Sequence, residues 1–215
     1  MSAADLVKQL KPLYSPSAKH PSIVEVPELA FLMIDGRGDP STSATYQDAL
    51  AALYGIAYTL KFALKKAAPE RDFKVAPLEG HWWADAERPS MAELESDRDS
   101  WNWTMMIALP DAVTAAEFAA AAEAAARRRP LPAAGRIRLE RFEEGLAAQI
   151  MHVGPYSTEA PTIAALHAFV EEQGYALHGR HHEIYLGDPR RTAPERLKTV
   201  IRHPVRAAGP PALPT

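Results

Sequence analysis

The chain has 215 residues, of which 47% are hydrophobic and 24% charged, and this length and composition allow a folded protein with a substantial core. Lysine and arginine total 24 against 27 acidic residues, so the net charge of −3 provides no basic field and argues against a nucleic-acid partner. The absence of cysteine excludes disulfides and thiolate chemistry and fits a reducing cytoplasm, where we expect the protein. At the N-terminus, residues 1–11 lack the apolar run of a signal peptide or membrane span, so we expect no membrane partner.

A weak internal repeat organises the chain, because residues 28–110 and 145–204 contain the same elements in the same order. Each half begins with an apolar stretch that leads into a turn rich in glycine and proline. These stretches, at residues 29–34 and 146–153, predict the first strand of each half.

A helix is predicted after each of these strands. Apolar residues recur every three or four positions in residues 46–64, and Ser43 or Thr45 can cap the helix N-terminus. The same spacing recurs in residues 163–170, where Gly174 ends the helix.

Two further strands are predicted in each half. A polar and aromatic strand comes first, at residues 80–85 and 180–188, and a strand that ends in proline follows, at residues 101–109 and 197–203. This repeated order predicts an α+β fold with two tandem β-α-β-β modules in one pseudo-two-fold domain, and a ligand groove between the modules.

The predicted domain spans residues 20–206, with repeat one at about 26–110 and repeat two at about 136–206. An alanine-rich linker helix at residues 114–129 separates the repeats and ends in three arginines. We interpret these arginines as a solvated cap that complements the helix dipole rather than a nucleic-acid patch. The proline-rich tail, residues 207–215, is expected to be disordered.

Three tryptophans form the first candidate cluster. Trp101 and Trp103 project from the same face of their strand because side chains alternate along it. His81 and Trp83 likewise share one face of the preceding strand, so we predict that Trp83, Trp101 and Trp103 meet on one surface. Such a surface is either an aromatic cage for a flat or cationic ligand or a bulky structural core.

The second cluster lies on the matching strand of the other half, where Glu183 and Tyr185 share a face with His181. If the pseudo-symmetry holds, this face looks across the groove at the tryptophans. A glutamate among aromatic rings would have a raised pKa and could act as an acid or base, or bind a cation. The alternative is a surface glutamate paired with Arg180 or Arg190.

Tyr156 follows a Gly-Pro turn at a strand end, where its phenol could donate a hydrogen bond or serve only the structure. Several histidines invite a metal interpretation: His152, His167, His178, His181 and His182. We do not adopt this interpretation, because adjacent histidines on a strand face opposite ways and no ligand spacing typical of a metal site is present. We therefore expect neither a metal nor a cofactor.

Several short blocks, taken together and in order, make the chain resemble the GyrI-like small-molecule-binding proteins, in their stand-alone branch. The resemblance covers residues 11–205. The blocks are Leu-Tyr-Ser-Pro at 13–16, Met-Ile-Asp-Gly-Arg-Gly-Asp-Pro at 33–40, Gly-His-Trp-Trp at 80–83, Trp-Asn-Trp at 101–103, Met-His-Val-Gly-Pro-Tyr at 151–156 and His-His-Glu-Ile-Tyr-Leu-Gly-Asp-Pro-Arg-Arg at 181–191.

This resemblance implies two SHS2-type modules around a ligand groove, in which the family's ligand-binding glutamate matches Glu183. Family members that regulate transcription carry an N-terminal helix-turn-helix, whereas only about twenty-five residues precede the first strand predicted here, so we expect no DNA-binding domain. A similar subfamily hydrolyses cyclopropanoid DNA-alkylating compounds in an aromatic cage.

For this chain the resemblance implies catalytic roles for Glu183 and Tyr156. The implied ligand-binding residues are Trp83, Trp101, Trp103, Tyr185, His181 and His152. The expected partner is a small planar aromatic or cationic molecule. The alternatives are a non-catalytic protein that sequesters such compounds, and an inhibitor of a protein partner, which would need an exposed apolar patch outside the groove. The sequence leaves the oligomeric state open.

Overall fold

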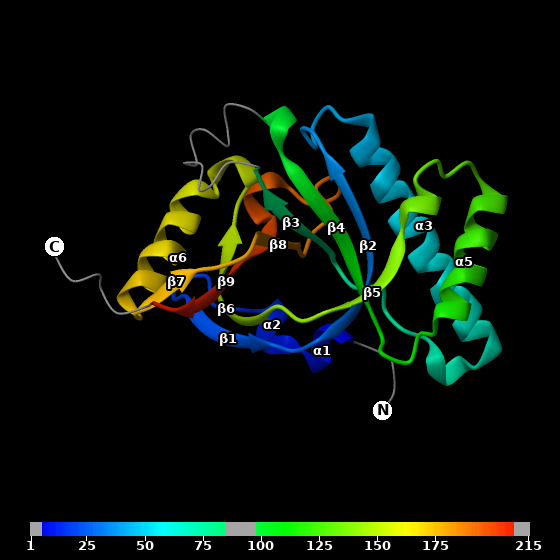
Figure 1. The fold of residues 1–215 in the computed structure, drawn as a ribbon, viewed down its shortest axis with the longest axis horizontal. Coiled ribbons are helices and arrows are strands. Elements are labelled where there is room, and N and C mark those ends of the chain that lie inside the picture. The colour runs from blue at the N-terminus through cyan, green and yellow to red at the C-terminus, as the bar shows by residue number, and fades with distance from the viewer. Residues whose placement is uncertain (1–5, 85–97, 209–215) are drawn as a thin grey trace, which may run out of the picture.

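A large antiparallel sheet with few helices forms the fold, which confirms the predicted α+β class (Figure 1). The computed structural model describes residues 6–84 and 98–208. The strand order is β1-β6-β9-β8-β3-β4-β2-β5, and β7 pairs with β9 outside this path. No helix in these described ranges is long and apolar enough to cross a membrane.

The helices and strands have the following bounds. The helices are α1 (Leu6–Gln9), α2 (Lys11–Tyr14), α3 (Ala44–Ala67), α5 (Ala115–Arg128) and α6 (Ala160–Glu172). The strands are β1 (Ser22–Val26), β2 (Leu29–Arg37), β3 (Leu78–Trp83), β4 (Asn102–Leu109), β5 (Arg138–Phe142), β6 (Gly145–Val153), β7 (Tyr175–Leu177), β8 (His181–Tyr185) and β9 (Lys198–Ala207).

The predicted repeat is visible in the order of the strands. β2, α3, β3 and β4 form the first half, while β6, α6, β8 and β9 form the second, with the short β7 inserted. In the sheet, the strands of the first half lie in the order β2-β4-β3 and those of the second half in the order β8-β9-β6. The two halves join where β3 pairs with β8. The interpretation of these halves as SHS2 modules stays a prediction.

Helix ends follow the sequence signals closely. The Ser43 side chain accepts a hydrogen bond from the Tyr46 amide and caps α3. The linker helix is α5, where Thr114 and Glu117 form a reciprocal capping box. The arginines at the end of α5 are exposed, as predicted for a solvated cap.

One predicted boundary is wrong, because β9 continues through Pro204 to Ala207 rather than ending at His203. A proline interrupts a strand only where its missing N–H is needed. Pro204 lies where one neighbour of β9 changes, after the last β8 pair at Arg202 and before the β7 pair at Val205. Of the other predicted segments, Asp85 and residues 209–215 lie outside the described residues.

The two faces of the sheet are covered differently. The helix face packs against α3 and α6, as the contact of Tyr46 with Trp103 and the hydrogen bond of His152 with Thr162 show. The back face packs against the N-terminal segment, where Tyr14 belongs to a buried cluster that includes Ile184. Figure 1 shows α3 with α5 at one end of the sheet and α6 at the other.

Gly36 provides a test of how tightly the helix face is packed. A Cβ atom added there would overlap the ring of Trp103, which is fully buried on the neighbouring strand. We expect Gly36→Ala to lower the free energy of unfolding by about 1–3 kcal/mol. Gly135→Ala is the control, because a Cβ at Gly135 meets nothing within 4 Å. Urea unfolding of both variants measures the difference, and equal stability of the two would contradict the packing described.

Candidate ligand-binding groove

The centre of the sheet brings the polar and aromatic strands of the two halves together. β3 and β8 pair with Gly80 opposite Glu183 and Trp82 opposite His181. Residues directly opposite each other in an antiparallel pair lie on the same face. Trp82, Glu183 and Tyr185 therefore all lie on the helix face. Gly80, opposite Glu183, leaves room for the Trp82 indole and the Met105 side chain, which a Cβ atom at this position would approach to 3.0 and 3.1 Å.

Glu183 is held by donors from its own strand. Its carboxylate accepts hydrogen bonds from the Tyr185 hydroxyl at 2.7 Å and lies 3.0 Å from Nε2 of His181. Burial alone would raise its pKa, but the hydrogen bonds and the charge of His181 lower the pKa overall. Glu183 is thus a carboxylate at neutral pH although its side chain is only 15% exposed.

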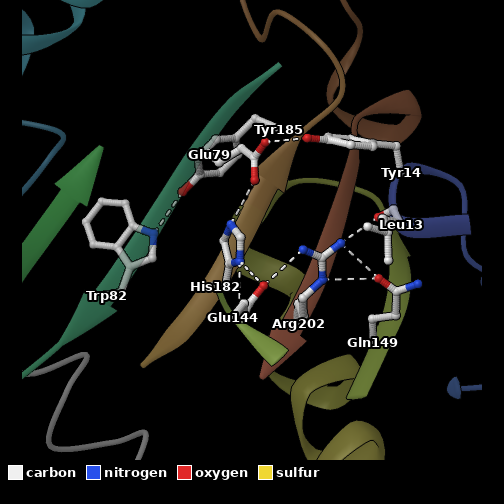
Figure 2. A network of polar contacts seen from close by, with 9 residues as sticks. All are labelled: Leu13, Tyr14, Glu79, Trp82, Glu144, Gln149, His182, Tyr185 and Arg202. Carbon is white, nitrogen blue, oxygen red and sulfur yellow. Dashed lines mark hydrogen bonds and ion pairs between the residues drawn. The ribbon is translucent and has the colours of Figure 1, made fainter. Parts of the chain in front are cut away.

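An indole extends this chain of hydrogen bonds. The Trp82 Nε1–H donates to the Tyr185 hydroxyl at 3.0 Å (Figure 2). That hydroxyl donates onward to Glu183. Burial and the charge of Glu183 raise the pKa of Tyr185 well above its ordinary value, so the phenol keeps its proton. The orientation of the carboxylate therefore depends on Trp82 through Tyr185.

Aromatic rings gather on the helix face near Glu183, where the groove is predicted. Tyr46 on α3 lies 6.2 Å from Trp82 and 5.2 Å, edge-on, from Trp103, measured between ring centroids. Trp101 meets Trp82 edge-on at 5.6 Å. Trp103 is fully buried and forms the base of this cluster, whereas Trp82 and Trp101 are partly exposed. The Arg98 guanidinium lies over the Trp101 ring, 5.4 Å from its centroid.

The predicted grouping of Trp83 with Trp101 and Trp103 is wrong. Trp82 lies opposite Trp103, while Trp83 lies opposite Asn102 and projects from the back face. There the Arg180 guanidinium sits over the Trp83 ring at 3.6 Å. His81 and Trp83 do share one face of β3, as the alternation predicts. The register of β3 against β4 decides which side chains of the two strands meet, and a shift of one residue in this register exchanges the faces.

Tyr156 lies beside Tyr185, with ring centroids 5.6 Å apart. Its side chain is partly exposed, and burial, together with the nearby charges of Glu159 and Glu183, raises its pKa to about 12. The phenol is therefore protonated at neutral pH and able to donate a hydrogen bond. Both the placement of Tyr156 at a groove mouth and its catalytic role stay predictions.

His152 lies on the helix face, and its side chain contacts the loop that carries Tyr156. Its Nδ1 lies 2.9 Å from the Thr162 hydroxyl on α6, and its Nε2 lies 3.3 Å from the Pro155 carbonyl oxygen. The imidazole thus ties the end of β6 to the start of α6. A direct contact of His152 with a ligand stays a prediction.

The alternative of a surface ion pair for Glu183 does not match the described contacts. Arg190 pairs with Asp188 at 3.0 Å, and Arg180 lies on the back face over Trp83. Within the described ranges, the hydrogen-bonded side chains at Glu183 are those of His181 and Tyr185.

The described part of the chain contains one cluster of side chains that could bind a metal ion, and its contacts do not favour a metal. His81, Glu144 and His182 bring ligand atoms within 4.8 Å of one another on the back face. Both nitrogens of His182 already contact carboxylates, and Arg202 pairs with Glu144 at 3.1 Å. A cation there would face the charge of Arg202, so the donor set fits an ion-pair network better than a metal site.

Three groove residues were missed by the sequence analysis. Trp82 was not predicted because the alternation in β3 favours Trp83 beside His81, and Tyr46 belongs to the apolar positions that predict the helix over residues 46–64. Glu159 is buried at the start of α6, where burial and the charge of Glu183 raise its pKa to about 8. Only its position after the Gly-Pro turn, near Tyr156, could have indicated it.

Comparison with known proteins identifies relatives of the whole chain. A family model described as the GyrI-like small molecule binding domain matches residues 19–206. A structure of an uncharacterized conserved protein from Listeria innocua is 42% identical, with a TM-score of 0.84 over 94% of this chain and 100% of that chain. A second structure from Listeria innocua, described as a hydrolase, is 41% identical, with a TM-score of 0.81 over the same shares.

A more distant structure shares the fold alone. It is the C-terminal domain of EcmrR, which is 15% identical, with a TM-score of 0.54 over 88% of this chain and 98% of that domain. No curated protein matches the chain.

Proposed function

The chain belongs to the GyrI-like small-molecule-binding family, and on that premise we propose that its groove binds planar aromatic or cationic compounds and hydrolyses cyclopropanoid alkylating agents by adding water. The observation that carries this proposal is the ionised Glu183 carboxylate beside the rings of Trp82 and Tyr185. The description of a 41% identical relative as a hydrolase supports the catalytic part.

The proposed reaction uses groups on both sides of the ligand. The ligand stacks against Trp82 and Trp101, and Glu183 takes a proton from a water as its oxygen bonds to a cyclopropyl carbon. The strained carbon–carbon bond breaks, and its electron pair moves through the dienone to the oxygen, where a phenolate forms that takes its proton from solvent. A hydrogen bond from Tyr156 stabilises the negative charge that grows on this oxygen.

The second candidate is a protein that sequesters the same compounds without converting them. The lowered pKa of Glu183 favours it, because a carboxylate already held by two donors is a weaker base but still a good partner for a cation. Cytoplasmic removal of toxic compounds is proposed in either case, with no nucleic-acid partner, in keeping with the net charge of −3.

An inhibitor of a protein partner is not proposed. Tyr58 and Phe62 are exposed and stack at 6.4 Å on α3. Exposed rings along one helix do not by themselves indicate a protein interface, which is usually marked by an apolar patch of several hundred Å².

Titration with a spirocyclopropyl cyclohexadienone distinguishes the two candidates. Binding is followed by tryptophan fluorescence, and the ligand is then weighed by mass spectrometry. Quenching with a gain of one water in the ligand supports the hydrolase. Quenching with intact ligand supports sequestration, and unchanged fluorescence contradicts binding in this groove.

The two adjacent tryptophans of β3 make a matched pair of variants. We expect Trp82→Ala to weaken ligand binding by roughly 5- to 100-fold, because it removes both a stacking face and the donor to Tyr185. Trp83→Ala removes a ring of the same size from the back face and should leave affinity within about three-fold. Fluorescence is unsuited to these variants, so isothermal titration calorimetry measures both affinities. The reverse order of effects would show that the ligand binds the back face.

A further inference from the structure

Gly80 lies at the point of the β3–β8 pairing over which three side chains of the site meet. It is paired with Glu183, while Trp82 and Tyr185 each lie two residues from this pair, on opposite sides of it along the sheet. Four residues of strand separate their positions, which is about 13 Å. The Trp82 Nε1–H nevertheless donates to the Tyr185 hydroxyl at 3.0 Å. The two side chains therefore lean toward each other over the Gly80–Glu183 pair.

The missing side chain of Gly80 gives this contact its space. A Cβ atom at this position would lie 3.0 Å from Nε1 of Trp82, the atom that donates to Tyr185. It would also lie 3.1 Å from Cε and Sδ of Met105 on β4. The Met105 side chain can turn about its rotatable bonds, whereas an indole is rigid and moves Nε1 only by moving the whole ring. A side chain at position 80 therefore displaces Trp82.

The main chain of β3 does not require glycine at this position. The φ angle of Gly80 is not positive, and the residue lies within a regular strand. A glycine inside a strand weakens it, and a β-branched residue such as valine is favoured there. The position therefore requires empty space above the strand rather than a special backbone conformation.

The Tyr185 hydroxyl connects this space to the carboxylate. It donates to Oε2 of Glu183 at 2.7 Å, while Nε2 of His181 lies 3.0 Å from Oε1. A hydroxyl has one proton to donate and also accepts hydrogen bonds, so the Trp82 donor holds the phenol oxygen while its proton points to Glu183. If the indole is displaced, Tyr185 loses one of the two contacts that fix its hydroxyl.

We propose that Gly80 is a positioning residue: its empty side-chain position holds the Trp82 indole against Tyr185, and through Tyr185 it orients the Glu183 carboxylate that accepts a proton from water. The effect on turnover rests on the proposed hydrolase function. The effect on the indole does not, because it follows from contacts within the ligand-free protein.

NMR of the ligand-free protein tests the position of the indole. We expect Gly80→Val to shift the Trp82 indole N–H signal toward its position in Tyr185→Phe, which lacks the acceptor. Exchange of this proton with solvent should become roughly 10-fold faster, as expected for the loss of one hydrogen bond. Gly80→Ala adds less volume and should shift the signal less, in the same direction. The Trp83 signal, on the back face, is the internal control. An unmoved Trp82 signal in Gly80→Val overturns the positioning role.

Turnover of a spirocyclopropyl cyclohexadienone tests the effect on Glu183. Gly80→Val should lower kcat by on the order of 10- to 100-fold, the scale of loss for a catalytic group misplaced by about 1 Å. In a Trp82→Leu background, where no indole has to be displaced, the same substitution should lower kcat by less than about three-fold. Equal losses in the two backgrounds overturn the positioning role, because residue 80 would then act through another neighbour such as Met105.

Gly135→Val is the matched control. Gly135 is exposed, and a Cβ atom there meets nothing within 4 Å, so the variant should keep the wild-type rate and the wild-type Trp82 signal.

The outcomes separate the two proposals. A displaced indole in Gly80→Val with turnover at the wild-type rate overturns the effect on Glu183 and leaves the hydrolase standing. A displaced indole with no turnover by the wild type overturns the hydrolase and supports the placement of Trp82 by Gly80.

Discussion

Replacing Glu183 by glutamine is expected to slow water addition by on the order of 10²- to 10⁴-fold, the usual contribution of a general base. Glutamine has nearly the same shape, so the groove should keep its packing. The amide cannot accept a proton from water, however, and it carries no charge for a cationic ligand. Mass spectrometry of the product at several times, combined with calorimetric titration, separates the rate from the affinity.

A neutral planar ligand is expected to bind Glu183→Gln within about three-fold of the wild type, since stacking on the rings is unchanged. Glu140→Gln, an exposed glutamate of β5, is the matched control and should keep the wild-type rate. A Glu183→Gln protein that converts substrate at the wild-type rate would remove Glu183 from the reaction.

The largest loss of stability is expected from Glu144→Gln on the back face. Glu144 contacts Nδ1 of His182 at 2.9 Å and Nη1 of Arg202 at 3.1 Å, and these three side chains are at most 3% exposed (Figure 2). Removing the one carboxylate between two buried cations costs about 3–5 kcal/mol in the free energy of unfolding. Arg202 keeps only Gln149 and the Leu13 carbonyl oxygen in this network.

Urea unfolding of Glu144→Gln and Glu140→Gln measures this effect. Among the described residues, Glu140 forms an exposed ion pair with Arg138, so its replacement should cost less than about 1 kcal/mol. Equal stability of the two variants would show that the back-face network is not an important source of stability.

The same network predicts a dependence of stability on pH. Burial lowers the pKa of His182, but Glu144 and Glu79 outweigh burial and raise it to about 9. A histidine whose folded pKa is raised stabilises the fold fully below its ordinary value of about 6.5. That contribution is lost as the pH rises through about 9. In Glu144→Gln we expect a smaller fall in stability over this range.

Much of the fold could be predicted from local patterns. The apolar spacing in α3, the Ser43 cap and the capping box of α5 depend on residues close in sequence, and these elements form where predicted. The edge strands β1 and β5 were missed because their partly exposed, charged sequences lack a clear alternation. They are strands because β6 and β2 offer them partners, which no local pattern reveals.

The site was predicted less completely, because it depends on cross-strand register. Glu183, Tyr185 and His181 were grouped correctly, since alternation within one strand fixes their common face. Trp83 was chosen in place of Trp82 because only the pairing of β3 with β4 decides which indole meets Trp103. Glu159 comes from another element altogether, the start of α6.

The most direct test of the groove is an NMR titration of the four tryptophan indole N–H signals with a spirocyclopropyl cyclohexadienone, each signal assigned by a single Trp→Phe variant. The Trp82 and Trp101 signals should move on ligand addition, because these rings line the helix face beside Glu183. The Trp83 signal, on the back face under Arg180, should stay in place. A ligand that moves Trp83 and leaves Trp82 unchanged would contradict the groove as the binding site.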